Sequence, residues 1–80
     1  MTTSMELSLY PIGEYAIGPI IDEFIGVLEE SNLTVNMGHM STIITGDSSK
    51  LFTALEKAYT MVAEKYGIVL VCKISNACPV

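Results

Sequence analysis

Residues 33–45, LTVNMGHMSTIIT, decide the fold because they place two strands side by side in the middle of the chain. Apolar side chains occupy alternate positions from Leu33 to Met37, which is the period of a strand. Gly38 and His39 interrupt this run before STIIT resumes a strand-like composition. We therefore expect a hairpin that turns over GHM, and the elements on either side of it determine the topology.

A helix is expected on each side of the hairpin. Pro19 suits the first position of a helix, where its missing N–H costs nothing, and an apolar stripe then runs to about Ser31. The second helix follows GDSS, residues 46–49, whose side chains offer capping oxygens, and ends before Gly67. The expected buried stripes are Ile17, Ile20, Ile21, Phe24 and Leu28 in the first helix, and Leu51, Leu55, Ala58 and Val62 in the second, widened by Phe52, Tyr59 and Met61.

Two more strands complete the order of elements. MELSLY, residues 5–10, alternates leucines with polar residues and stops at Pro11, and IVLVCKIS, residues 68–75, is rich in β-branched residues. The order β-α-β-β-α-β predicts an α+β fold of the ferredoxin-like type, with a four-stranded antiparallel sheet and both helices on one face. We expect a single domain over residues 1–80, with a loose tail at residues 1–4.

The face of the sheet without helices is predicted to be apolar as well. Ile43 and Ile44 fall on opposite faces of the third strand, and the last strand carries valines opposite Ile68 and Leu70. Burying these extra side chains, at roughly 25 cal/mol per Å², requires a second layer that two short helices cannot provide. We therefore expect a homo-oligomer, at least a dimer, formed through the open sheet face.

Charge and composition exclude several classes of function. The chain has a formal net charge of −5, four lysines and no arginine, so it lacks the basic surface that nucleic-acid binding requires. Without a guanidinium group it also cannot bind phosphoryl oxygens as an acylphosphatase-like enzyme would. A neutral or cationic small molecule is the ligand that fits this composition best.

The sequence also bears on location and metals. The start, MTTSMELSL, has no basic region followed by an apolar one, and no later run approaches about 18 apolar residues. We expect a cytoplasmic protein without a membrane span.

Cys72 and Cys78 form neither a C-x-x-C pair nor a secreted disulfide framework, and His39 has no metal-ligating partner at a recognisable spacing. We therefore expect reduced thiols, no metal and no cofactor.

Four short motifs occur in order along the chain: SLYP at residues 8–11, GHMST at 38–42, GD at 46–47 and SNACP at 75–79. With these motifs the chain resembles the YkoF-type proteins, which bind thiamine and hydroxymethylpyrimidine. Members that it resembles best carry two ferredoxin-like repeats per chain, whereas this chain corresponds to one. Related one-domain thiamine-binding proteins assemble by stacking their sheets, which implies that two chains here can replace the two repeats.

The resemblance also implies a ligand-binding site. The family's Tyr-Pro falls on Tyr10 and Pro11, its His-x-Ser on His39 and Ser41, and its Ser-x-x-Cys-Pro on Ser75, Cys78 and Pro79, whereas Gly38 replaces an often acidic or bulkier residue. An aminopyrimidine offers a flat face for stacking and an edge with donors and acceptors, which a tyrosine ring, hydroxyls and an imidazole can serve. The predicted ligand-binding residues are Ser8, Tyr10, Met37, His39, Ser41, Ser75 and Cys78.

Structural roles for the same residues stay open. His39 can be an ordinary hairpin residue, Tyr10 a core aromatic and Met37 a gap filler. The predicted function is non-catalytic binding of thiamine or its pyrimidine precursor in uptake, salvage or sequestration. The alternatives are a regulatory or protein-interaction module that docks a partner protein on its open sheet face, and an enzyme of pyrimidine or thiazole salvage. We do not expect an enzyme, because no paired carboxylates or activated nucleophile are evident.

Overall fold

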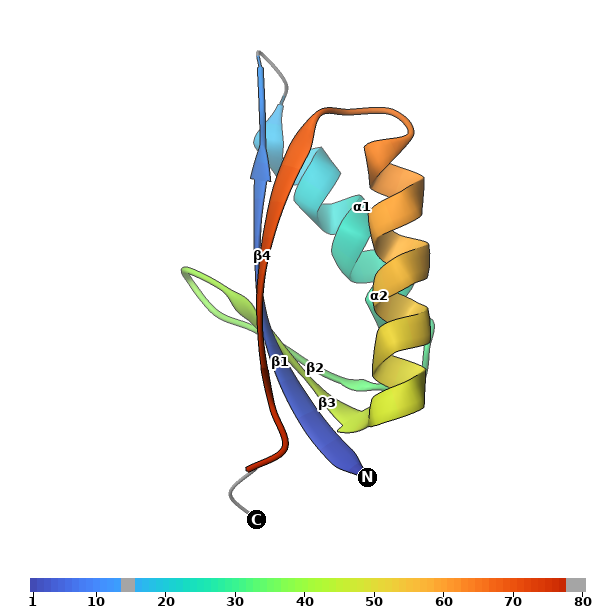
Figure 1. Cartoon of the computed structure of the whole chain (residues 1–80). Coiled ribbons are helices and arrows are strands. Elements are labelled where there is room, and N and C mark those ends of the chain that lie inside the picture. The colour runs from blue at the N-terminus through green and yellow to red at the C-terminus, as the bar shows by residue number, and fades with distance from the viewer. Residues whose placement is uncertain (14–15, 78–80) are drawn as a thin grey trace.

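The computed structural model describes residues 1–13 and 16–77. Its elements are β1 (Thr2–Pro11), α1 (Ile17–Glu29), β2 (Thr34–Met37), β3 (Thr42–Asp47), α2 (Ser48–Ala63) and β4 (Ile68–Ser75). The strands form one antiparallel sheet in the order β2-β3-β1-β4, and both helices cover the same face of it (Figure 1). The predicted βαββαβ ferredoxin-like fold is confirmed. No helix in the described ranges is long and apolar enough to cross a membrane.

The start of the chain is more ordered than the sequence suggested. β1 pairs with β3 from Thr2 onward, where Thr2 lies opposite Asp47, and the Thr3 side chain is only 3% exposed. In addition, the Ser48 N–H donates a 2.9 Å hydrogen bond to the Met1 carbonyl oxygen. The loose tail predicted for residues 1–4 is therefore wrong, because strand pairing with β3 holds this segment against the sheet.

The first helix begins earlier than Pro19. α1 starts at Ile17, so Pro19 occupies its third position, where a proline is tolerated because the first four N–H groups of a helix have no acceptor within it. After the helix, Asn32 adopts a positive φ of 62°, which asparagine accepts more readily than most residues. This left-handed residue reverses the chain and leads it back into the sheet at β2.

The second helix buries a narrower stripe than predicted. Leu51, Ala54, Ala58 and Val62 are its buried residues, while Leu55 is only half-buried. Phe52 and Tyr59, expected to widen the buried face, are 52% and 47% exposed, and Met61 is exposed as well. The expectation fails because α2 packs against α1 and the sheet through the side that carries Ala54 and Ala58. The Phe52 and Tyr59 rings lie beside that contact, in an open groove that Ile68 and Leu70 of β4 also line.

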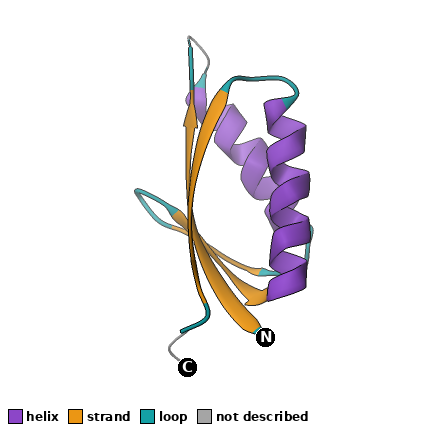
Figure 2. Cartoon of the chain, in the orientation of Figure 1, coloured by secondary structure: helices purple, strands orange, loops and turns teal. Residues whose placement is uncertain are grey.

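The hydrophobic core lies between the sheet and the two helices. Figure 2 shows the strands on one side, the helices on the other, and the turn between β2 and β3 projecting away from the helices. The largest fully buried side chains come from all of these elements and are Phe24, Met5, Leu28, Ile44, Leu51 and Val62. The Lys65 ammonium group also pairs with the Glu23 carboxylate, which ties the end of α2 to α1.

The open face of the sheet is mixed rather than uniformly apolar. Ile43 is 41% exposed there while its neighbour Ile44 is fully buried, as their opposite directions predicted, and Val69 and Val71 are also exposed. The central strand β1 is polar on this face, because the alternation that turns its leucines toward the helices turns Glu6 and Ser8 outward. Polar groups thus separate the apolar side chains of β3 from those of β4.

Candidate functional site

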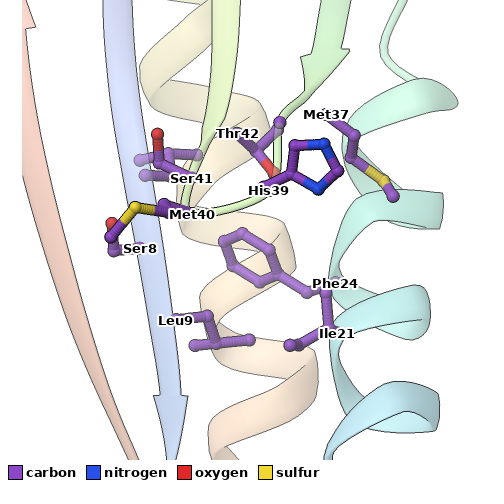
Figure 3. A pocket seen from close by; sticks show the side chains of 11 residues that line it. Ser8, Leu9, Ile21, Phe24, Met37, His39, Met40, Ser41 and Thr42 are labelled. Atoms are coloured by element: carbon purple, nitrogen blue, oxygen red, sulfur yellow. The ribbon is translucent and has the colours of Figure 1, made fainter.

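A cavity of about 130 Å³ opens beside β1, at the point where β3 begins. The two strands pair only as far as Leu7 opposite Thr42, because β3 begins at Thr42, whereas β1 continues to Pro11. Within residues 1–13 and 16–77, no strand pairs with this last part of β1 on its β3 side. The fold therefore leaves a notch in the sheet, bordered by the β2–β3 turn on one side and by α1 on another (Figure 3).

The notch has an apolar base and a polar rim. Leu9 comes from β1, and Ile21 and Phe24 come from α1, and Figure 3 shows the Phe24 ring lying between these two aliphatic side chains and the turn. The rim carries the hydroxyl groups of β1 and of the turn, together with an imidazole. The full lining is Leu7, Ser8, Leu9, Ile21, Phe24, Met37, Gly38, His39, Met40, Ser41 and Thr42.

Four of the predicted ligand-binding residues meet at this cavity, namely Ser8, Met37, His39 and Ser41. They come from β1, from the end of β2 and from the turn that follows it. Their convergence depends on the register of the sheet, which sets the turn beside the unpaired end of β1. His39 is exposed at the rim, and no hydrogen bond or ion pair occupies its imidazole among the described residues, so both ring nitrogens are available to a ligand.

The other predicted residues lie elsewhere. Tyr10 is exposed on the open face opposite Val69 and does not line the cavity. Ser75 lies opposite Ser4, four residues or about 13 Å along β1 from Ser8, and its hydroxyl accepts a 3.0 Å hydrogen bond from the Ala77 N–H. Cys78 lies outside the described residues.

Several cavity residues were not predicted from the sequence. Phe24 and Ile21 were assigned to the buried stripe of the first helix, and Leu9 to the buried side of the first strand. The period of an apolar pattern shows which side chains face inward, but not whether the space they face is filled. Met40 could have been added to the predicted site from the sequence alone, since it stands next to His39 in the turn.

Ser41 is held in place by two interactions. The Gly38 N–H donates a 2.8 Å hydrogen bond to the Ser41 carbonyl oxygen, which closes the turn. The Ser41 hydroxyl donates a 3.1 Å hydrogen bond to Glu6 Oε2, and Lys73 Nζ lies 3.7 Å from Glu6 Oε1. A carboxylate on the open sheet face is therefore one hydrogen bond away from the rim of the cavity.

Metal-ligating side chains and the thiol of Cys72 are the other groups in the described part of the chain that could carry chemistry. Residues 1–13 and 16–77 contain no group of three or more His, Cys, Asp or Glu side chains arranged to hold a metal ion. Burial raises the pKa of the Cys72 thiol, which disfavours the reactive thiolate form. Cys72 is half-buried and packs against the core.

Comparisons with known proteins bear on both family and fold. The sequence profile described as the YkoF-related family matches residues 2–80. No curated protein matches the chain. A hypothetical protein of Methanocaldococcus jannaschii shares 23% identity at a TM-score of 0.86, with 96% of this chain and 81% of that chain covered.

Two further solved structures have the same fold. A Streptococcus pneumoniae protein shares 21% identity at a TM-score of 0.85, covering 94% of this chain and 86% of its own. A Thermotoga maritima protein proposed to act in thiamine biosynthesis or salvage shares 14% identity at a TM-score of 0.85, covering 94% of this chain and 83% of its own. At such low identities these likenesses establish the architecture alone.

Proposed function

This chain belongs to the YkoF-related family, and on that premise we propose that it binds the aminopyrimidine ring of thiamine or of hydroxymethylpyrimidine without transforming it. The binding serves uptake, salvage or sequestration of the vitamin. One observation carries the proposal: Ser8 of β1 and three residues of the stretch 37–41, namely Met37, His39 and Ser41, line a single cavity. The Thermotoga maritima neighbour, which is named for thiamine biosynthesis or salvage, is consistent with this ligand class.

The size of the cavity supports a ring of this kind. Its volume of about 130 Å³ is close to that of an engineered protein cavity of ~150 Å³ that binds benzene. Drug-sized ligands occupy pockets of roughly 300 Å³ or more. One six-membered ring therefore fits the notch, with its substituents reaching the rim.

The chemistry of the lining supports a flat ring with apolar faces and a polar edge. Leu9 and Phe24 offer apolar surface to the face of the ring. The hydroxyl of Ser8 and the imidazole of His39 can donate to ring nitrogens or accept from the exocyclic amino group. The Ser41 hydroxyl, whose proton is donated to Glu6, can still accept from that amino group. The backbone of β1 beyond Leu7 has no strand partner on this side among the described residues, so it offers further donors and acceptors.

The charge of the chain supports neutral or cationic forms of the ligand. The formal net charge is −5, and the cavity lining contains no lysine or arginine. A phosphate group on the ligand would meet this negative field without a cationic partner in the cavity lining. We therefore expect thiamine phosphates to bind more weakly than thiamine.

Calorimetric titration with hydroxymethylpyrimidine, thiamine and thiamine diphosphate tests the proposal. His39→Ala and Ser8→Ala should each weaken binding of the pyrimidine by roughly fivefold, the effect of losing one hydrogen bond of about 1 kcal/mol. Ser75→Ala is the matched control, since it removes a predicted hydroxyl that lies away from the cavity. Mass spectrometry of the recovered ligand checks that it is unchanged.

Tyr10→Ala decides between the cavity and the open sheet face as the place of binding. If Tyr10→Ala and Ser75→Ala weaken binding while His39→Ala and Ser8→Ala do not, the ligand lies on the open face and the cavity assignment is wrong. The exposed apolar side chains of that face, Ile43, Val69 and Val71, favour a second candidate function, a protein-interaction module. Absence of heat with all three ligands would favour this second candidate.

A further inference from the structure

We propose that Glu6 makes the mouth of the cavity selective for a pyrimidine that carries a positively charged substituent, such as the thiazolium ring of thiamine. This inference rests on the proposed function, because it concerns the same cavity. It adds a residue that lies outside the cavity lining, and it states which form of the ligand that residue favours.

The volume of the cavity forces a second ring to lie outside it. About 130 Å³ holds one six-membered ring, so the thiazolium ring of thiamine must extend past the rim. The base is closed by Phe24, which is 1% exposed, and by Leu9 and Ile21. An extended ligand therefore leaves by the rim, where Ser8 and the turn are located.

Glu6 is the carboxylate linked to this rim. It lies two residues before Ser8 on the open face of β1, and its Oε2 accepts the 3.1 Å hydrogen bond from the Ser41 hydroxyl. Both serines line the cavity. A cationic group that emerges between Ser8 and Ser41 thus comes close to a negative charge whose position is held by the turn itself.

Lys73 is the competing cation. Its Nζ lies 3.7 Å from Glu6 Oε1, and the lysine and glutamate side chains are 80% and 41% exposed. Such an exposed ion pair is weak and its long lysine side chain is free to move away. A ligand cation can therefore replace the lysine beside Glu6. An uncharged pyrimidine forms no ion pair with Glu6 and so does not displace the lysine.

Two other carboxylates, both on α1, lie between the cavity-lining residues Ile21 and Phe24 in the sequence. Asp22 follows the lining residue Ile21 and is exposed, and Glu23 is already paired with Lys65. Asp22→Asn is therefore the matched control for Glu6→Gln, because it removes the same charge from the helix side of the cavity. Glu6→Gln keeps a carbonyl oxygen that can still accept from Ser41, so it removes the charge while preserving the turn.

The experiment compares two ligands across four proteins. Hydroxymethylpyrimidine, which is uncharged, and thiamine, which is cationic, are titrated into the wild type, Glu6→Gln, Lys73→Gln and Asp22→Asn at low and high salt. Glu6→Gln should weaken thiamine roughly threefold and leave hydroxymethylpyrimidine unchanged, in keeping with the strength of exposed charge pairs. Lys73→Gln should strengthen thiamine by a similar factor, Asp22→Asn should have no effect, and salt should reduce the differences.

Each contrary outcome has a definite meaning. An equal loss for both ligands in Glu6→Gln would show that Glu6 only positions Ser41, and no loss for either would show that it plays no part; both results overturn the inference while the proposed function stands. A loss of thiamine binding in Asp22→Asn instead would place the charged ring on the helix side. If the wild type binds neither ligand, the proposed function fails and this inference fails with it.

Discussion

Gly38 and Ser41 close the turn between β2 and β3 through a 2.8 Å hydrogen bond from the Gly38 N–H to the Ser41 carbonyl oxygen. The contact leaves little room for a larger residue, since a Cβ atom on Gly38 would lie 3.1 Å from that oxygen. The resemblance to YkoF-type proteins implied an often acidic or bulkier residue at position 38. The turn is therefore tighter here than an acidic or bulky residue would allow.

Gly38→Ala should weaken ligand binding more than it weakens folding. The added methyl group displaces the Ser41 carbonyl by a few tenths of an ångström and shifts the rim of the cavity, which we expect to cost on the order of 0.5 to 1 kcal/mol of binding free energy. Titration with hydroxymethylpyrimidine measures the loss. Gly26→Ala in α1 is the control, because its added Cβ meets nothing within 4 Å beyond its chain neighbours and the backbone of its own helix. An unchanged affinity in Gly38→Ala would show that the turn does not shape the site.

Ile44→Val and Ile43→Val should differ strongly in their effect on stability. Ile44 is fully buried between the sheet and the helices, so losing one methyl group there should cost about 1 kcal/mol of unfolding free energy. Ile43, next to it on the open face, should change stability by less than about 0.5 kcal/mol in an isolated subunit. Urea unfolding at low protein concentration measures both, and equal costs would contradict the assignment of the two faces.

A homo-oligomer formed through the open sheet face stays a prediction, which Val71→Lys can test. Val71 is exposed on this face of β4, across the strand pair from Ser8. We expect the wild type to sediment as a dimer or larger species and Val71→Lys to sediment as a monomer, because the new charge would have to be buried in the interface. Thr53→Lys on α2 is a suitable control, since that residue is exposed on the helical side. A monomeric wild type would refute the prediction.

Asp47 should make the stability of the protein depend on acid. The hydrogen bond from Ser49 Oγ, at 2.7 Å, and then the Met1 ammonium group, at 3.3 Å, hold the pKa of Asp47 below its ordinary value of 3.8. Because the folded-state pKa is lowered, the stabilisation is fully present above pH 3.8 and is lost as the pH falls through the folded-state pKa. Asp47→Asn should make the melting temperature depend less on pH below pH 4. Parallel curves of melting temperature against pH for the wild type and the variant would refute this role.

The fold could be predicted from the sequence because its elements are marked locally. The alternation from Leu33 to Met37 and the glycine after it were enough to place the hairpin. The second helix was placed correctly, but it begins at Ser48, inside residues 46–49, and its N-cap residue Asp47 makes no side-chain capping hydrogen bond. The start of β1 was missed, since Thr2 and Thr3 carry no alternating apolar pattern and are ordered only by pairing with β3. Phe52 and Tyr59 were misplaced because the apolar stripe of a helix does not show how much of that stripe the sheet and the other helix cover.

The candidate site was predicted in part. Met37 ends β2, and His39 and Ser41 lie in the turn that follows it, so proximity along the chain was enough to group them. The inclusion of Ser8, and the distance of Tyr10 and Ser75 from the cavity, depend on which residue of β1 lies opposite which residue of β3 and β4.

The amino-acid sequence by itself determined the order of strands and helices, the buried side of each strand and the acidic, arginine-free character that favours an uncharged or cationic ligand. Only the tertiary structure decided that β3 begins at Thr42, opposite Leu7, while β1 runs on to Pro11, and that the resulting notch is backed by Phe24. The physical reason is that periodicity reports which way a side chain points, whereas a cavity arises from strand register and helix packing between segments distant in the chain.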